Sequence, residues 1–359
     1  MTTATSTPPV LLARQIADDL LRPSAEQVDR TVVPRSHLDA WSAAGLLGLA
    51  GPRAYGGAEA PARVVREVTE VLAGASGATW FVATQHATPL AVLTGSSNGH
   101  LRERLLRPLC TGEVLAGVAV AHLRRPGPPA VSAARTPGGW RFDGHVGWMT
   151  GWGICDVFLL GGASRDGEFV TVLVPARDAE GLSASEPLQL AAMEATRTVT
   201  LELDGFHVGD EDVVDVEPSS DWLTLDATKT ANPSPHVFGL QRECVRRLAE
   251  TAVRRSDSTA GLLAEQLREE GERLRAVAYT LLDDVPAAEQ IEDRLAVRAS
   301  ALELVVRTAT ALVTATGGSA MALDAAPQRL AREALFCLVQ AQTSAVREAT
   351  LALFREVSA

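Results

Sequence analysis

The chain has 359 residues, of which 46% are hydrophobic and 21% are charged, and its formal net charge is −11. This length fits two or three packed domains, and the composition is that of a soluble globular protein. The acidic balance argues against a nucleic-acid partner, and no apolar run approaches the roughly 20 residues of a bilayer helix, so we expect no membrane span.

The N-terminus and the cysteines contain no pattern that indicates secretion, disulfides or metal binding. Residues 1–9 lack the basic start and apolar block of a secretory signal. Cys110, Cys155, Cys244 and Cys337 lie far apart, with no C-x-x-C spacing and no nearby pair of histidines. We therefore expect a cytoplasmic protein with reduced thiols, no disulfide framework and no metal site.

The N-terminal third has a helical pattern. Between residue 11 and about residue 109, apolar side chains recur at helical spacing, as at Val64, Val68 and Val71, and Gly and Pro separate the segments. The pattern predicts an N-terminal helical domain over residues 1–113.

The middle third has a strand pattern. Between residues 114 and 216 the apolar period becomes two, as in 169–174 and 198–203, with Gly-rich turns between the segments. This predicts a middle β domain built as a small antiparallel sheet or barrel. Residues 217–235 contain three prolines and no periodicity, so we expect a connection there.

The helical pattern returns from residue 236 to the end. Its long segments cover 238–257, 259–284, 289–316 and 327–356. Helices of this length with one apolar stripe pack as antiparallel bundles, which predicts a C-terminal four-helix bundle over 236–359. The expected fold is therefore α+β and multidomain: a helical domain, an antiparallel β domain and a helical bundle.

Four passages resemble those of one known family. Residues 37–57 hold an Ala-Gly-Leu followed by P-x-x-Y-G-G, and residues 104–113 end a helix in a Gly-Glu turn. Trp148 and Thr150 form a W-x-T in the β segment, and residues 317–334 join a Gly-Gly to P-Q-R-L-A-R-E-A. Together these passages resemble the acyl-CoA dehydrogenase superfamily of flavoproteins, whose fold has the domain order predicted here.

The resemblance implies an FAD cofactor. In the family the W-x-T packs against the flavin and hydrogen-bonds it near its reactive nitrogen. An arginine-phenylalanine passage that reaches the FAD diphosphate of a neighbouring subunit is reduced here to Arg254 and Arg255. FAD shared across subunits implies a homodimer or homotetramer. The cofactor residues implied are Trp148, Thr150, Thr196, Arg254, Gly317 and Gly318. The alternative is a β-domain core residue at Trp148, a turn residue at Thr150 and a charged helix surface at Arg254.

The usual catalytic base of the family is missing. Most members place a glutamate in a Glu-Gly-Thr near the end of a late helix, and counting along this chain puts Ala341 there. Alanine cannot accept a proton. A minority of members place the base on the helix after the β domain, within about one residue of Asp226. Asp226 is therefore the predicted substitute base, and the alternative is a solvated aspartate of the connection.

The CoA-binding loop of the family has also changed. Its T-E-P-x-x-G-S-D is replaced by A-H-L-R-R-P-G-P over residues 121–128. Such changes resemble relatives that use reduced flavin and oxygen to hydroxylate or N-oxidise small molecules. There His86, His122 or His145 would serve as acid or base, because the ordinary histidine pKa is near neutral. His86 is the first candidate, because it lies on the helix that lines the acyl pocket in the family; the alternative is a structural histidine.

The function expected is that of an FAD-dependent oxidoreductase that oxidises an acyl thioester, on CoA or a carrier protein, or a related small molecule. One alternative is a flavin-dependent monooxygenase, served by a flavin reductase. The other is a flavin-free, non-redox descendant or partner subunit. No G-x-G-x-x-G opens a βαβ unit, so a Rossmann nicotinamide site is not expected.

Overall fold

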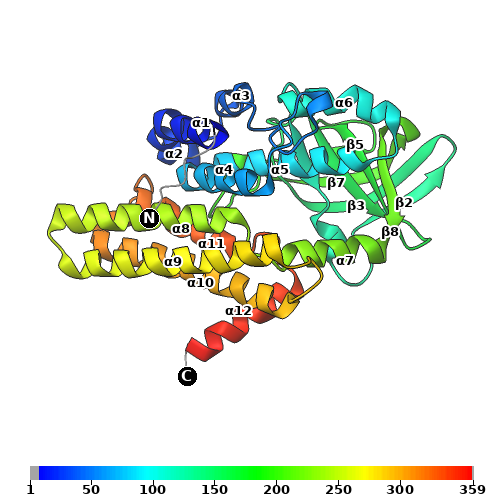
Figure 1. Cartoon of the computed structure of the whole chain (residues 1–359). Coiled ribbons are helices and arrows are strands. Elements are labelled where there is room, and N and C mark those ends of the chain that lie inside the picture. Colours follow the sequence, from blue (N-terminus) through cyan, green and yellow to red (C-terminus); the bar gives the residue numbers. More distant parts are fainter. Residues whose placement is uncertain (1–7, 358–359) are drawn as a thin grey trace.

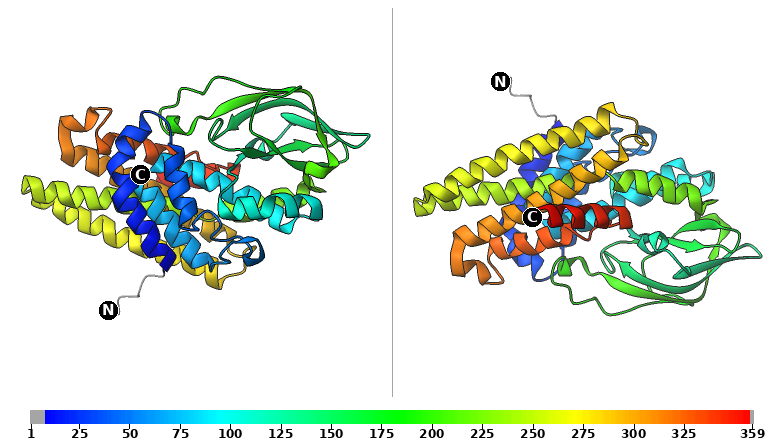
Figure 2. Two further views of the ribbon diagram at one scale, coloured as in Figure 1. Left: turned by 90° about the horizontal axis from the view of Figure 1, so that it is seen from above. Right: turned by 90° about the horizontal axis from the view of Figure 1, so that it is seen from below.

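The computed structural model describes residues 8–357; residues 1–7, most of the segment expected to hold no secretory signal, and 358–359 lie outside it. A helical bundle forms the long body, the N-terminal helices cover one side of it, and the β domain lies at one end (Figures 1 and 2). Within residues 8–357, no helix is long and apolar enough to span a bilayer. The expected domain order is therefore confirmed.

The N-terminal domain is helical throughout. Its helices are α1 Pro8–Ile16, α2 Arg22–Asp29, α3 Arg35–Ala43, α4 Ala62–Ala75, α5 Gly77–Gly95 and α6 Gly99–Thr111. Helix α5 starts at Ser76, whose hydroxyl accepts from the Thr79 amide, and α6 starts at Asn98, which caps the Leu101 amide. Helix α6 ends at Gly112 in the left-handed region, where glycine has no steric cost, so the Gly-Glu turn ends the helix as predicted.

The β domain is one mixed sheet. Its strands are β1 Ala116–Ala119, β2 Val131–Thr136, β3 Gly139–Met149, β4 Val157–Ala163, β5 Glu168–Pro175, β6 Leu182–Ala184, β7 Val199–Gly209 and β8 Val213–Pro218. The order is β6-β7-β3-β2-β4-β5-β8, and β1 pairs in parallel with β4. Most other pairs are antiparallel, and one face of β3, β5 and β7 buries Phe142, Val172 and Leu201.

The stretch expected as an irregular connection contains a helix, α7 Ser219–Thr230. Of its residues only Thr230 is buried, so it carries no apolar stripe from which a helix could be predicted. It is fixed by Trp222, whose ring meets Phe169 of the sheet edge to face with centroids 5.5 Å apart.

The C-terminal bundle consists of α8 Pro235–Arg255, α9 Ser258–Asp284, α10 Ile291–Thr316, α11 Ala326–Cys337 and α12 Ser344–Val357. The segment 327–356, expected as one helical stretch, is divided by a turn in which Ala341 has φ +47°. The fully buried Arg294 donates to the carbonyls of Leu281, Val285 and Pro286 at the end of α9. There its charge meets the negative end of the helix dipole.

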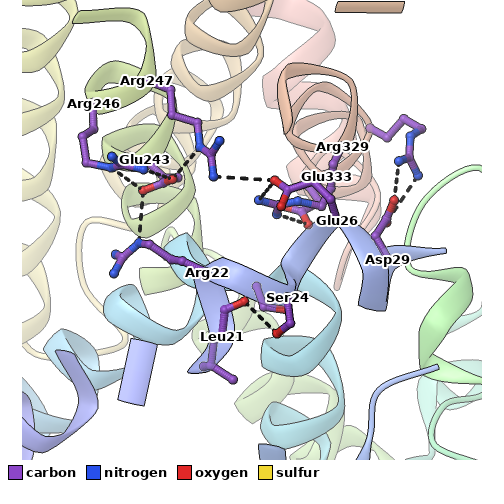
Figure 3. Close-up of polar contacts among 12 residues, drawn as sticks. Leu21, Arg22, Ser24, Glu26, Asp29, Glu243, Arg246, Arg247, Arg329 and Glu333 are labelled. Carbon is purple, nitrogen blue, oxygen red and sulfur yellow. Dashed lines mark hydrogen bonds and ion pairs between the residues drawn. The ribbon is translucent and has the colours of Figure 1, made fainter. Parts of the chain in front are cut away.

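Charged residues join the N-terminal helices to the bundle (Figure 3). Glu243 of α8 accepts from Arg246 at 2.6 Å and from Arg247 at 2.7 Å, and it also pairs with Arg22 of α2. Through Arg247 the network continues to Glu26 of α2 and from there to Arg329 and Glu333 of α11, and Arg332 of α11 pairs separately with Asp29 of α2. Glu243, Arg329 and Glu333 are buried, whereas Arg246, Arg247 and Glu26 are partly exposed at the edge of the contact.

Candidate functional site

Trp148 lies on the outer face of β3. Its side chain is 49% exposed, whereas Val146 and Met149 on the same strand point into the core of the sheet. A β-bulge between Val146 and Met149 interrupts the alternation of side chains between the two faces of the strand, and the indole between them lies outward. Trp148 is therefore an exposed aromatic and not a core residue of the β domain.

Three threonine hydroxyls gather close to this strand end. Thr150 Oγ1 lies 3.0 Å from Thr198 Oγ1, which lies 3.2 Å from Thr196 Oγ1, and all three residues are buried. The Thr196 hydroxyl donates to the Met193 carbonyl at 2.7 Å. The structure thus brings Thr150 and Thr196 together, and adds Thr198, which the sequence analysis did not select.

A strained loop presents Thr196. Met193 and Arg197, which flank the 3-10 turn Glu194–Thr196, have φ of 61° and 50°. Such backbone costs energy and persists only where the surroundings fix it. Here Arg197 Nε donates to the Trp152 carbonyl at 3.0 Å, and Ala195 packs in the core of the N-terminal helices.

A buried cation binds the backbone of the turn at Ala341, the residue that the sequence count placed at the position of the family's glutamate. Arg298 of α10 donates to the carbonyls of Gln340 at 3.0 Å and Ala341 at 3.2 Å, and also to the carbonyl of Thr230. Burial lowers the pKa of Arg298 to about 10, and the nearby charge of Arg124 acts in the same direction. The Ala341 turn is therefore held by a guanidinium on its backbone carbonyls, and Ala341 itself offers no carboxylate.

Asp226 is close to this turn but is already paired. Its two oxygens accept from Nε and Nη2 of Arg124, each at 2.7 Å. The carboxylate side chain is 13% exposed, so Asp226 is not a solvated residue of a connection. Helix α7 connects Asp226 to this turn: Thr230 lies one helical turn after Asp226, and its carbonyl accepts from Arg298. Arg124 and Arg298 were missed because their partners are distant in sequence.

His86 is built into the backbone framework. Its Nδ1 accepts from the Ala116 amide at 3.1 Å, which places the proton on Nε2, the donor to the Leu109 carbonyl at 2.9 Å. Burial lowers its pKa to about 4. Both nitrogens are therefore occupied, and this geometry favours the structural role of His86 over the role of acid or base.

The other two histidines differ from each other. His122 is buried, with Nε2 at 2.8 Å from the Gly161 carbonyl and with no partner for Nδ1 within the described residues. His145 is exposed and pairs with Glu202 on the neighbouring strand, Nδ1 to Oε1 at 2.6 Å. Within residues 8–357, neither histidine hydrogen-bonds to a threonine of the cluster.

The remaining predicted cofactor residues lie at the far end of the bundle. Arg255 Nη2 donates to the Thr316 carbonyl at 2.5 Å, next to Gly317, and Arg254 donates to Thr251 at 3.0 Å. The last turn of α8 and the Gly317 turn thus meet at the end of the bundle opposite the β domain (Figures 1 and 2). Within one chain they are separated from Trp148.

The sequence is similar to one family model over its N-terminal domain and to two characterised proteins over about half of its length. Residues 11–113 match the family model described as acyl-CoA dehydrogenase, N-terminal domain. Benzylmalonyl-CoA dehydrogenase of Aromatoleum aromaticum is 22% identical over 201 residues, 55% of this chain and 53% of that protein. The 3-(aryl)acrylate reductase of Clostridium sporogenes is 26% identical over 216 residues, 56% of each. The chain spans about half the length of the curated relatives it matches.

Solved structures resemble the whole chain. Butyryl-CoA dehydrogenase of Megasphaera elsdenii has a TM-score of 0.82 and 14% identity, over 99% of this chain and 100% of that one. Glutaryl-CoA dehydrogenase of Mycobacterium smegmatis, in complex with FADH2, has a TM-score of 0.80 and 17% identity, over 96% and 93%. Dibenzothiophene monooxygenase of Paenibacillus has a TM-score of 0.79 and 16% identity, over 96% of each chain. Residues 11–113 thus match the N-terminal domain of acyl-CoA dehydrogenases, and the chain as a whole shares the fold of these solved structures.

Proposed function

We propose that the protein is an FAD-dependent oxidoreductase whose isoalloxazine lies against Trp148 and the threonine cluster. An exposed indole face suits a flat aromatic ring system, and the buried hydroxyls of Thr150 and Thr198 suit its polar edge. The structural neighbour with FADH2 supports this choice of cofactor. When bound, FAD would supply the redox chemistry, and the chain's own residues would position it and the substrate.

Among flavin-dependent reactions, we favour oxygenation of a small molecule with reduced flavin and O2. The observation that carries this choice is the turn at Ala341, whose carbonyl accepts a hydrogen bond from Arg298. Abstraction of an α-proton would need a carboxylate at this turn. A positioned base contributes about 10²–10⁴ in rate, so the absence of a carboxylate at Ala341 argues against dehydrogenation. A separate flavin reductase would then deliver the reduced cofactor.

Dehydrogenation of an acyl thioester is the second candidate, and Asp226 is the observation that favours it. This carboxylate lies on α7 beside the Ala341 turn, linked to it through Thr230 and Arg298. To act as a base, Asp226 must first lose one of its two bonds to Arg124. Both curated relatives are oxidoreductases by name, a dehydrogenase and a reductase.

The cofactor assignment is tested by the visible absorption spectrum of the purified protein, before and after excess FAD and desalting. We expect retained flavin bands in the wild type and loss of them in Trp148→Ala and Thr150→Val. His145→Ala is the control, because this residue is exposed on the same strand. A folded wild type that retains no flavin would instead favour a loosely held cofactor or a flavin-free descendant.

The reaction type is tested next on the flavin-loaded protein. NADH and O2 consumption with an added flavin reductase, stimulated by a substrate, would support oxygenation. Bleaching of the flavin by butyryl-CoA under anaerobic conditions, abolished in Asp226→Asn, would contradict it and establish dehydrogenation. Asp226→Asn keeps one acceptor oxygen for Arg124, but it replaces the other with an NH2 donor, so the basic oxygen and one of the two bonds to Arg124 are lost together.

A further inference from the structure

The β-bulge of β3 turns two consecutive residues to the outer face of the sheet. Gly147 and Trp148 lie between two core-facing pairs of β3 with β7, and together they oppose the single residue Thr200. Trp148 is exposed, and Gly147 has no side chain to cover the strand. The outer face of the strand is therefore open beside the indole.

The side chain of Arg125 lies over this open position. Among the described residues outside its chain neighbours, the heavy atom nearest to a Cβ built on Gly147 is Nη2 of Arg125, at 3.9 Å. Arg125 is exposed, and its guanidinium makes no hydrogen bond or ion pair within residues 8–357. The acidic residue of β3 does not compensate it, because Asp143 accepts from Arg141 at 2.9 Å. An unpaired guanidinium thus lies on the same face as Trp148.

The backbone that carries Arg125 is fixed. Its amide donates to the His122 carbonyl at 3.1 Å, at the end of the 3-10 turn Ala121–Arg124. His122 is buried, and its Nε2 lies 2.8 Å from the Gly161 carbonyl of β4, which attaches the turn to the sheet. Pro126 follows and favours the extended backbone that Arg125 adopts, with φ −77° and ψ 128°. The free guanidinium is therefore presented from a fixed position.

A free guanidinium at this place suits a phosphate. Arginine presents its donors in a planar fork that matches phosphate oxygens, and the resulting charge-assisted hydrogen bonds are strong. The chain has a net charge of −11, so a phosphate needs a local cation to bind. The loop 121–128 has two arginines, and Arg124 is already paired with Asp226. Arg125 is the one that is available.

We propose that Arg125 binds the phosphate that follows the ribityl chain of the flavin, and so holds the cofactor beside the ring that Trp148 faces. The inference rests on the proposed function, because it takes the isoalloxazine to lie against Trp148. It does not depend on a neighbouring chain, because Arg125 and Trp148 belong to the same chain.

The test compares riboflavin, which has no phosphate, with FMN, which adds one phosphate to the same ring and chain. Dissociation constants are measured by flavin fluorescence polarisation on the full chain freed of flavin. We expect the wild type to bind FMN about tenfold more tightly, as one charge-assisted hydrogen bond provides. Arg125→Gln should bring this ratio close to one and leave the riboflavin constant unchanged. Arg141→Gln is the control and should keep the ratio, because Arg141 already pairs with Asp143.

A second pair of variants tests the geometry. Gly147→Asp places a carboxylate within reach of Arg125, and this ion pair should compete with the phosphate and lower the ratio. Gly147→Asn has the same shape without the charge, so its ratio should stay above that of Gly147→Asp. Raising the ionic strength from about 0.1 M to about 1 M shortens the Debye length from about 10 Å to about 3 Å. This change should lower the ratio in the wild type but not in Arg125→Gln.

The outcomes separate this inference from the proposed function. Riboflavin binding that is present in the wild type and lost in Trp148→Ala supports the flavin site itself. If FMN then binds no more tightly than riboflavin, or if Arg125→Gln keeps the wild-type ratio, the role of Arg125 is overturned and the proposed function stands. If neither riboflavin nor FMN binds to the folded protein, both fail.

Discussion

At the scale of single residues, the buried histidines make backbone or side-chain contacts that depend on their neutral form. His86 bridges the Leu109 carbonyl and the Ala116 amide, and His236 stacks on Trp80 with Nδ1 at 2.7 Å from the Ser234 hydroxyl. Protonation of His86 would turn its acceptor Nδ1 into a donor facing the donor of Ala116. These contacts make the stability of the protein dependent on pH.

We expect stability to fall as the pH drops below the ordinary histidine pKa. Burial lowers the pKa of His86 to about 4 and that of His236 to about 3, from 6.5. Below pH 6.5 these histidines therefore bind more protons in the unfolded chain than in the folded one. Each histidine makes its full contribution to the free energy of unfolding above pH 6.5. As the pH falls from there to the folded pKa, that contribution decreases by about 1.4 kcal/mol per pH unit. Urea unfolding between about pH 7.5 and pH 5 measures the slope, and His86→Gln, which cannot titrate, should be less steep.

Arg298 gives a second prediction at this scale. Arg298→Met leaves the carbonyls of Thr230, Gln340 and Ala341 without their donor, and we expect a loss of about 2–4 kcal/mol of unfolding free energy. The turn between α11 and α12 should also become accessible to limited proteolysis. Arg298→Lys should recover part of the loss, because an ammonium has three donors but lacks the planar fork. Equal stability of Arg298→Met and the wild type would show that the three bonds contribute little.

At the scale of elements, α4 crosses α8 with the backbones in direct approach. A Cβ at Gly239 would lie 2.1 Å from the Glu70 carbonyl oxygen, and one at Gly74 would lie 2.7 Å from the carbonyl oxygen of Gly239. Backbone cannot move aside as a flexible side chain can, so only glycine allows this helix separation.

We expect Gly239→Ala to destabilise the protein by about 1–3 kcal/mol through overpacking, or to prevent folding. Gly261→Ala on α9 is the matched control, because its Cβ would meet only the Ala252 Cβ, at 3.9 Å. There the higher helix propensity of alanine should stabilise by up to about 1 kcal/mol. Denaturant unfolding of both variants decides: destabilisation by Gly261→Ala, or none by Gly239→Ala, would contradict this account of the crossing.

The elements also show which features a sequence can reveal. The long helices α8, α9 and α10 were predictable because each carries a buried apolar stripe. Helix α7 was not, because only Thr230 is buried, and the turn at Ala341 has neither glycine nor proline to mark it. In the site, the W-x-T motif pointed to Trp148 and Thr150. The pair of Arg124 and Asp226 joins residues 102 positions apart, which no local pattern reveals.

At the scale of the whole molecule, the predicted cofactor residues fall into two groups. Trp148, Thr150 and Thr196 lie in the β domain, whereas Arg254 and Gly317 lie at the opposite end of the bundle, where the neighbouring Arg255 binds the Thr316 carbonyl (Figure 1). One FAD cannot contact both groups of the same chain. The far end also exposes apolar side chains, with Val253 82% and Leu262 70% accessible, as expected of a surface covered by another copy.

We therefore expect complementation between two variants, each defective at one end. Trp148→Ala and Arg254→Glu should each lose FAD retention as homo-oligomers. In a symmetric dimer that mixes them, one site carries both defects and the other carries neither, so random mixing should restore about a quarter of the sites. Flavin absorbance after co-refolding measures this, with affinity tags of two kinds to prove that chains have exchanged. Restoration requires that the two groups come from different copies. If exchanged mixtures retain no more flavin than the separate variants, Arg254 does not belong to the site of a neighbouring chain.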